Sequence, residues 1–235
     1  MLTFVAATCV LWALSGCLAV VAGLAATVGS ASTRVVWRRL TGIAITLSRG
    51  LPTSLLVVAA GVISIRIPPQ SWLPDPFPGT ASQSAPVAWA VLVALAAGSA
   101  GHFAVIFRAA YETLGRVRTE QALVLGMSSV RRLWLLSRES AVAAIPPTSA
   151  RLVHHLHNTA FAALFPVADL FGWIENGANA TFDITRYVVA GGAAYVLLSG
   201  LIWASFKVLE MRLGRHLAPA RPGARLRTPA VGAVR

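Results

Sequence analysis

Five long apolar runs, separated by shorter polar segments, constrain the fold of this 235-residue chain more than any other feature of its sequence. A helix needs about 20 apolar residues to cross the roughly 30 Å hydrocarbon core of a bilayer. Hydrophobic residues make up 56% of the chain and charged residues only 12%, well outside the averages of soluble domains. We therefore predict an all-α integral membrane protein with about five transmembrane helices. The predicted spans cover residues 3–28, 50–66, 86–108, 142–168 and 187–209.

The basic residues predict the orientation of these spans, because cytoplasmic loops are enriched in Lys and Arg. With the N-terminus outside, 17 of the 20 Lys and Arg residues fall in three cytoplasmic segments. These segments are the linker before the second span, residues 108–138 and the segment from Lys207 onward. The predicted external loops instead carry acidic residues, namely Asp75, Asp169, Glu175 and Asp183. We therefore predict an N-out, C-in topology.

The spans and their loops are predicted to form one transmembrane domain over residues 1–216. The Pro-, Arg- and Ala-rich segment 217–235 is expected to be a disordered cytoplasmic tail. Residues 68–86 and 174–186 are predicted to be external loops. The net charge of +12 does not indicate nucleic-acid binding, since the Arg residues flank apolar runs and form no patch with interleaved aromatic residues.

The longest polar stretch between spans, residues 108–139, carries the most informative motif. Glu120, Ala122 and Gly126 form the pattern E-x-A-x-x-x-G on a segment with helical spacing. This pattern resembles the EAA loop of ABC importer permeases. The sequence from residue 108 to Gly126 also has the layout of the polar amino acid permeases, without a gap.

The resemblance implies that a cytoplasmic coupling helix lies in the loop 109–141, between spans three and four. Such a helix fits a cleft in a separate ATPase subunit and passes its movement to the membrane helices. Gly126 would supply the turn that ends the helix. The residues expected to dock on the ATPase are Glu120, Ala122, Gly126, Arg116, Arg118 and Arg131. The chain has no G-x-x-x-x-G-K-[ST] loop, so a partner would bind and hydrolyse ATP, and we expect no cofactor in this chain.

Two further segments resemble the same family. Residues 48–58 match the start of its second span at Arg49, Gly50 and Pro52. Residues 145–170 match the family's fourth span, with aligned prolines. The resemblance therefore extends over most of the chain.

The chain also departs from the family pattern, including in the coupling loop and in the fourth predicted span. Arg138 and Glu139 stand where permeases usually have a Leu-Pro pair, so the second arm of the coupling loop is expected to be differently bent or more helical. His157 and Asn158 replace a Lys and an Asp. These replacements indicate either altered substrate chemistry or a half-site that has decayed in a heterodimer.

A polar stripe lies near the middle of the predicted fourth span. Its members, at positions i, i+3, i+4 and i+7 and thus on one helix face, are Arg151, His154, His155 and Asn158. Ionisable groups at this depth normally face the bundle interior or water. We predict that the stripe, with Thr159 and with His102 of span three, lines a translocation path. Arg151 would then offer its guanidinium to a substrate carboxylate.

Other interpretations of these residues stay open. A shifted helix would place Arg151 at the cytoplasmic interface and let the histidines form interhelical hydrogen bonds, and His102 could also be packed between helices. Metal ligation by His154, His155 and His157 is disfavoured, because adjacent histidines point apart on a helix and no carboxylate or Cys flanks them. We therefore predict no metal site.

Together, the resemblance and the residues predict a multi-pass permease subunit in a bacterial inner membrane that imports amino acids or related small polar solutes. Its implied partners are cytoplasmic ABC ATPase subunits, a second permease subunit, an external solute-binding protein and membrane lipid. The alternative is a non-transporting scaffold or sensor that keeps the coupling helix, which the missing Leu-Pro pair favours. An enzyme is the weakest alternative, since no nucleophile or acid–base partner lies at a helical spacing from the span-four histidines.

Overall fold

The computed structural model of the chain describes residues 1–67, 74, 76, 85–113, 115–127 and 129–215. Every regular element among these residues is a helix, as predicted. The elements are α1 (Leu2–Ser30), α2 (Val35–Gly50), α3 (Thr53–Ser64), α4 (Ala85–Glu112), α5 (Gly115–Val124), α6 (Ser129–Asn158), the 3-10 helix η2 (Thr159–Leu164), α7 (Leu170–Thr181) and α8 (Ile184–Arg215). The predicted tail and most of the predicted loop 68–86 lie outside the described residues.

Three helices in the described part of the chain, α1, α4 and α8, are long and apolar enough to cross a membrane. They contain the predicted spans 3–28, 86–108 and 187–209, which makes the chain a multi-pass membrane protein. Helices α2 and α3 meet the same criterion only as a pair, bent by 101°. The predicted span 142–168 falls on α6 and η2, which do not meet it. The total of five spans therefore remains a prediction.

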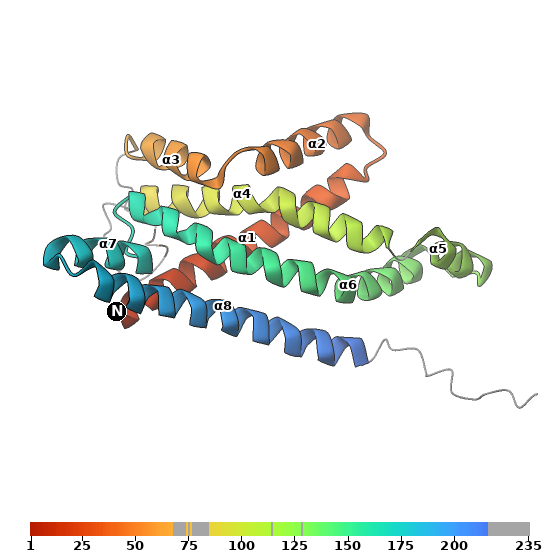
Figure 1. Ribbon diagram of the computed structural model, residues 1–235. Helices are drawn as coiled ribbons and strands as arrows, with labels where there is room; N and C mark the ends of the chain where they lie inside the picture. Colours follow the sequence, from red (N-terminus) through yellow and green to blue (C-terminus); the bar gives the residue numbers. More distant parts are fainter. Residues whose placement is uncertain (68–73, 75, 77–84, 114, 128, 216–235) are drawn as a thin grey trace, which may run out of the picture.

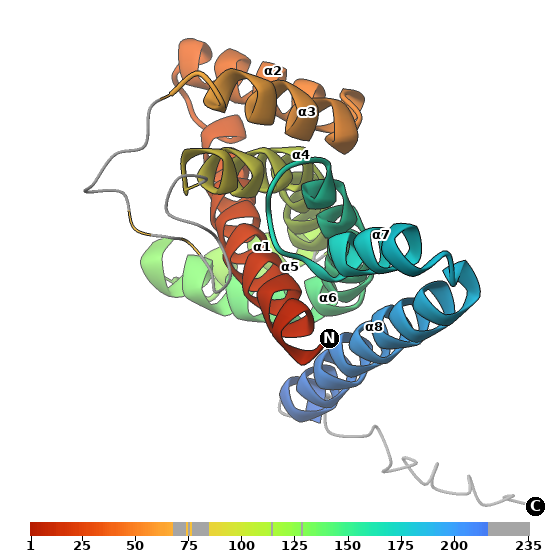
Figure 2. The ribbon, with the colours of Figure 1, turned by 90° about the vertical axis from the view of Figure 1, so that its left-hand side faces the viewer.

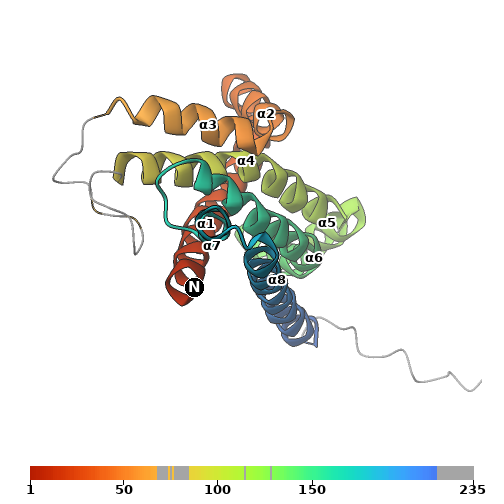
Figure 3. The same cartoon turned by 60° about the vertical axis from the view of Figure 1, so that its left-hand side comes forward.

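The long helices run alternately between two ends of the bundle (Figure 1). The N-terminus, α7 and the first turn of α4 lie at one end, which we name the α7 end. Helix α5 and the last turns of α8 lie at the other end, which we name the α5 end. Helix α4 lies between the α2–α3 pair and α6 (Figure 3). Seen from the α7 end, α2 and α3 form one flank of the bundle and α8 the opposite flank (Figure 2).

Helix α4 forms the centre of the bundle because small residues let its neighbours approach closely. A Cβ added to Gly23 of α1 would lie 2.6 Å from the Cβ of Phe103, which is fully buried. On the opposite flank, a Cβ added to Gly101 would lie 2.7 Å from the carbonyl oxygen of Ile45 on α2. These approaches make α4 the most buried of the three apolar helices.

The segment expected to be a linker before the second span is helix α2. Apolar residues recur at helical spacing along it, at Val36, Leu40, Ile43 and Leu47. The helix ends at Gly50, and Leu51 has an extended backbone with ψ of 132°. A proline ring disfavours the α conformation of the residue before it, here Leu51. Pro52 also has no N–H that could continue the helical hydrogen bonds. The bend between α2 and α3 therefore lies at the Leu51–Pro52 pair.

The segment predicted to be an external loop, 174–186, is mostly helical, because it contains the end of α7 up to Thr181 and the start of α8 from Ile184. Asp169 caps this helix, because its carboxylate accepts hydrogen bonds from the N–H groups of Phe171 at 3.3 Å and Gly172 at 2.9 Å. The N–H of Leu170 donates to Thr8 Oγ1 of α1 at 2.8 Å. A cap and a tertiary contact together fix the start of α7.

The second arm of the predicted coupling loop is helical, which is one of the two outcomes expected there. Helix α6 begins at Ser129 and continues through Pro146 and Pro147. Prolines remove N–H donors from a helix and leave carbonyl groups unpaired. Next to them, Ser149 Oγ donates to the carbonyl oxygen of Pro146 at 2.8 Å. The polar residues of the fourth predicted span are therefore carried by a long helix that starts near the α5 end.

Candidate functional site

Polar side chains of α2, α3, α4 and α6 meet about halfway along the bundle. We name this cluster the polar junction, and its members are Ser48, Arg49, Thr53, Ser99, His102, Arg151, His154, His155 and Asn158. It includes five of the six residues predicted to line a path. The sixth, Thr159, is buried at the start of η2, where its Oγ1 donates to the carbonyl oxygen of Leu156 at 2.7 Å.

Arg151 is anchored to α4 through one nitrogen of its guanidinium. Nη2 donates to the carbonyl oxygen of Gly98 and to Ser99 Oγ, both at 3.0 Å. Its Nε is buried and has no hydrogen-bond partner among the described residues. A guanidinium has five N–H donors. This half-buried side chain therefore holds a fixed position while keeping donors for another group.

His155 is fully buried between two serines. Its Nε2 lies 2.8 Å from Ser15 Oγ of α1, and its Nδ1 lies 2.8 Å from Ser99 Oγ of α4. The tautomer follows from the neighbours. Ser15 donates its hydroxyl hydrogen to the carbonyl oxygen of Leu11 at 2.6 Å, so its oxygen accepts the hydrogen of Nε2.

The opposite ring nitrogen completes a directed chain of hydrogen bonds. Nδ1 of His155 accepts from the hydroxyl of Ser99, and the oxygen of Ser99 accepts from Arg151. A neutral imidazole with its hydrogen on Nε2 satisfies every partner. This chain joins α1, α4 and α6. His155 therefore makes interhelical hydrogen bonds, the alternative considered for it in the sequence.

The other predicted residues differ in their accessibility. His102 is half-buried and lies within electrostatic range of Arg151, Arg49 and His154. Arg49 and His154 are exposed. Asn158 is buried, and its Nδ2 lies 3.4 Å from Thr53 Oγ1 on α3. The accessible part of the polar junction is therefore basic, and its amide and hydroxyl groups connect helices.

The sequence did not indicate four members of the polar junction as path residues, namely Ser48, Arg49, Thr53 and Ser99, nor Ser15 of α1, which binds His155. Ser48 Oγ donates to the carbonyl oxygen of Ala97 and accepts the N–H of Gly101 at 2.8 Å. The available signal was a hydroxyl residue inside an apolar helix, where such groups bond across helices. Among the described residues, no group of three or more His, Cys, Asp or Glu side chains lies close enough together to hold a metal ion.

Helix α5 carries the motif predicted to couple the chain to an ATPase. Glu120 is exposed, whereas Ala122 is buried. Gly126 has a positive φ of 67°. Its N–H donates to the carbonyl oxygen of Leu123, and the N–H of Met127 donates to the carbonyl oxygen of Ala122. These two bonds form a Schellman motif, which ends a helix with a left-handed glycine. The side chains of Arg116, Arg118 and Arg131 lie outside the described residues.

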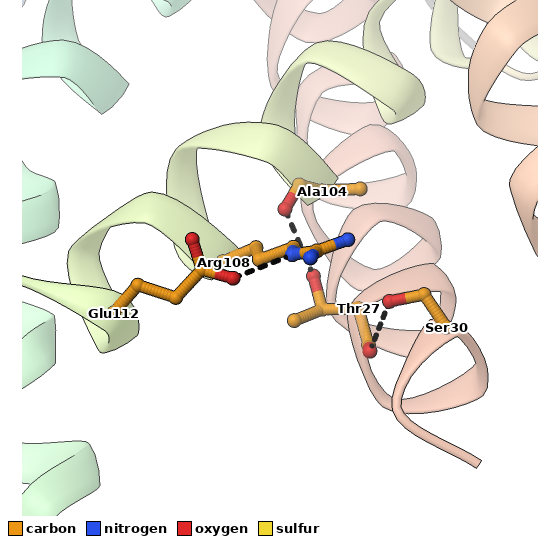
Figure 4. A network of polar contacts seen from close by, with 5 residues as sticks. All are labelled: Thr27, Ser30, Ala104, Arg108 and Glu112. Atoms are coloured by element: carbon orange, nitrogen blue, oxygen red, sulfur yellow. Dashed lines mark hydrogen bonds and ion pairs between the residues drawn. The ribbon is translucent and has the colours of Figure 1, made fainter. Parts of the chain in front are cut away.

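Polar contacts tie α4 to α1 just before the chain enters α5 (Figure 4). Thr27 Oγ1 donates to the carbonyl oxygens of Gly23 at 2.8 Å and Ala104 at 3.2 Å. One turn further along α4, Arg108 Nε donates to Glu112 Oε1 at 2.8 Å, forming an exposed i,i+4 ion pair. Such exposed pairs contribute about 0.5 kcal/mol at most. The α1–α4 packing therefore supports the base of α5 more than this ion pair does.

The described fold is similar to chains of two solved ABC transporters. A chain in the crystal structure of an amino acid ABC transporter with histidines matches with a TM-score of 0.73 and 18% identity, over 87% of this chain and 90% of that chain. A chain of the MetNI methionine ABC transporter, in inward-facing conformations, matches with a TM-score of 0.69 and 16% identity, over 91% and 95%. No protein-family profile and no curated protein matches the sequence. The helices of this chain thus share their arrangement with chains of ABC transporters.

Proposed function

We propose that the chain is a membrane-spanning permease subunit of an ATP-driven importer of amino acids or related small polar solutes. The observation that carries this proposal is the basic, partly accessible polar junction in the middle of a bundle whose fold occurs in ABC transporters. Ionisable groups at such a depth normally face a water-filled cavity or the bundle interior. Arg49, His102, Arg151 and His154 would contact the solute, and the buried His155, Asn158 and Thr159 would support them.

The arrangement of charges supports the N-out, C-in orientation for this subunit. The first turns of α2 and the last turns of α8 are rich in Arg and Lys, and both lie at the α5 end. Asp169, Glu175 and Asp183 lie in or next to α7, at the opposite end. Cytoplasmic segments are enriched in Lys and Arg. The α5 end would therefore face the cytoplasm of a bacterial cell. Helix α6 would cross the membrane in addition to α1, α4, α8 and the bent pair α2–α3.

Helix α5 would couple this bundle to a cytoplasmic ABC ATPase that binds the ATP. It projects at the α5 end with Glu120 exposed, and it is attached to the centre of the bundle through α4 (Figure 1). A second permease subunit would close the exposed side of the polar junction. A solute-binding protein would deliver the solute to the α7 end.

The assembly can be tested by tagging the chain, expressing it with the products of the neighbouring genes, and identifying by mass spectrometry what co-purifies from the membrane. The expected result is an ATPase with a Walker A sequence, bound in a defined ratio. A chain that purifies alone, or with unrelated membrane proteins only, would contradict the proposal. An assembled complex that hydrolyses ATP but moves no solute would favour the scaffold or sensor alternative.

A further inference from the structure

The basic residues of the polar junction have no acidic partner in the described part of the chain. The ion pairs described there are Arg108–Glu112 and Lys207–Glu210, both near the α5 end. The chain has only eight Asp and Glu residues. Glu139, the one on α6, precedes Arg151 by twelve residues, or about 18 Å of helix. Arg49 and Arg151 are therefore left without a counter-charge from their own helices.

Unpaired charges at this depth are costly. An Arg at the centre of a membrane helix strongly opposes insertion unless it is paired or hydrated. A second copy of this chain at that side would bring the same basic groups and therefore no counter-charge. A negatively charged ligand is the occupant that complements the site.

A neutral amino acid complements this site only in part. Its carboxylate suits the free donors of Arg151. Its ammonium group needs acceptors or a counter-charge, because a buried charge without them is strongly unfavourable. His102 and the two exposed groups within electrostatic range of it, Arg49 and His154, offer no carboxylate to receive it. A solute with more carboxylate than ammonium groups fits the site better than a zwitterion or a cation does.

The polar face of α2 extends this basic surface toward the α5 end. Arg38, Gly42, Thr46 and Arg49 are related by i, i+4, i+8 and i+11, so they share one helix face. A shallow, open and largely apolar groove of about 410 Å³ lies along this side of α2, lined only by residues of that helix: Arg38, Arg39, Gly42, Ile43, Thr46 and Leu47. A Cβ added to Gly42 would meet no atom within 4 Å, so the glycine leaves the groove open. The groove and the polar junction share the same helix.

We propose that this permease subunit selects small organic anions in which carboxylates outnumber ammonium groups, and that the polar face of α2 forms the inner half of their route. The proposal rests on the proposed function and narrows its substrate class. Acidic amino acids and dicarboxylates share the required chemistry. Arg49 lies on the same face of α2 as Arg38 and Thr46 and within electrostatic range of His102, so it is the α2 residue that we assign to the polar junction.

Binding of three related solutes to the purified full-length complex tests this proposal. Glutamate, glutarate and glutamine are close in size, and they differ in carboxylate and ammonium content. Ligand-induced shifts of the thermal unfolding midpoint would be measured at matched ionic strength. We expect a half-saturating glutamate concentration at least about tenfold below that of glutamine, which corresponds to about 1.4 kcal/mol. If glutarate binds as tightly as glutamate, the site accepts dicarboxylates in general. If glutarate binds more weakly than glutamate, the site is specific for acidic amino acids.

Two charge-matched variants show whether Arg49 carries the preference. Arg49→Gln should reduce the glutamate-to-glutamine ratio at least about threefold. Arg34→Gln removes the same charge just before α2, outside the groove, and should leave the ratio unchanged. The inference would be overturned if glutamine bound as tightly as glutamate. It would also be overturned if Arg49→Gln and Arg34→Gln lowered the glutamate-to-glutamine ratio equally. Either result, obtained with the ATPase still bound, would leave the proposed function intact, whereas absence of the ATPase would count against that function itself.

Discussion

Ser99 Oγ lies 2.8 Å from Nδ1 of His155, in a hydrogen bond that crosses the buried interface between α4 and α6. The same oxygen accepts a hydrogen bond from Arg151. One hydroxyl group therefore connects the chain of bonds that holds three helices together with the side chain that we expect to meet the solute. Changes in helix packing and in solute binding would be coupled at this serine.

Removing the buried imidazole should destabilise the bundle, and removing its exposed neighbour should not. His155→Ala leaves Ser99 and Ser15 without their partner and opens a cavity, at a cost of about 2–5 kcal/mol. His154→Ala is a matched control on the next, exposed position and should change stability by less than about 0.5 kcal/mol. Thermal unfolding in detergent would measure both variants. Equal effects would show that the interhelical bonds of His155 contribute nothing.

The close approach of α2 to α4 predicts that Gly101→Ala is destabilising. The new Cβ would lie 2.7 Å from the carbonyl oxygen of Ile45, and backbone atoms cannot rotate away. Overpacking of this kind costs about 1–3 kcal/mol. Gly200→Ala on α8 provides the control, because its Cβ meets no atom within 4 Å and alanine favours the helix. The expected order of unfolding midpoints is Gly200→Ala at or above the parent and Gly101→Ala below it.

The turn after α5 predicts a specific effect of Gly126→Ala. An added Cβ meets no atom within 4 Å, so the cost arises from the positive φ and amounts to about 1–2 kcal/mol. We expect weaker binding of the ATPase at unchanged insertion into the membrane. Gly50→Ala, at a helix end without positive φ or nearby atoms, is the control and should bind the ATPase normally. Normal ATPase binding by Gly126→Ala would exclude a requirement for this turn.

The exposed carboxylate on α5 predicts the effect of charge reversal. Glu120→Lys should weaken co-purification of the ATPase at least about threefold, because opposite charges at an interface guide docking. Gln121→Lys adds a positive charge at the adjacent exposed position and should have a smaller effect. Pull-down of the ATPase at two salt concentrations would compare them. If both variants lost ATPase binding equally, Glu120 would have no specific role in docking.

The sequence predicts elements whose signal is local. The apolar runs that became α1, α4 and α8 needed only their composition. Helix α2 also has a local signal, the apolar spacing of the segment before Pro52, so a linker is the wrong prediction for that segment. Helix α7 depends on the cap by Asp169 and on a contact with Thr8 across 162 residues, which no local pattern contains.

The polar junction shows the same limit. Periodicity placed His154 and His155 on one stripe, yet only His155 is buried. The difference arises from Ser15, which lies 140 residues away in the sequence, and from Ser99. Helical spacing gives the side of a helix on which residues lie. The neighbours that come to that side decide which of those residues are accessible.

ATP-driven uptake into proteoliposomes tests the central claim most directly. The complex would be reconstituted with the solute-binding protein from the neighbouring genes, and a mixture of labelled amino acids that includes glutamate would be offered outside, with ATP inside. We predict accumulation that requires ATP and falls at least about tenfold in Arg151→Ala, with the ATPase still bound. Equal uptake by the parent and Arg151→Ala, or none by an assembled complex that hydrolyses ATP, would contradict a solute path through the polar junction.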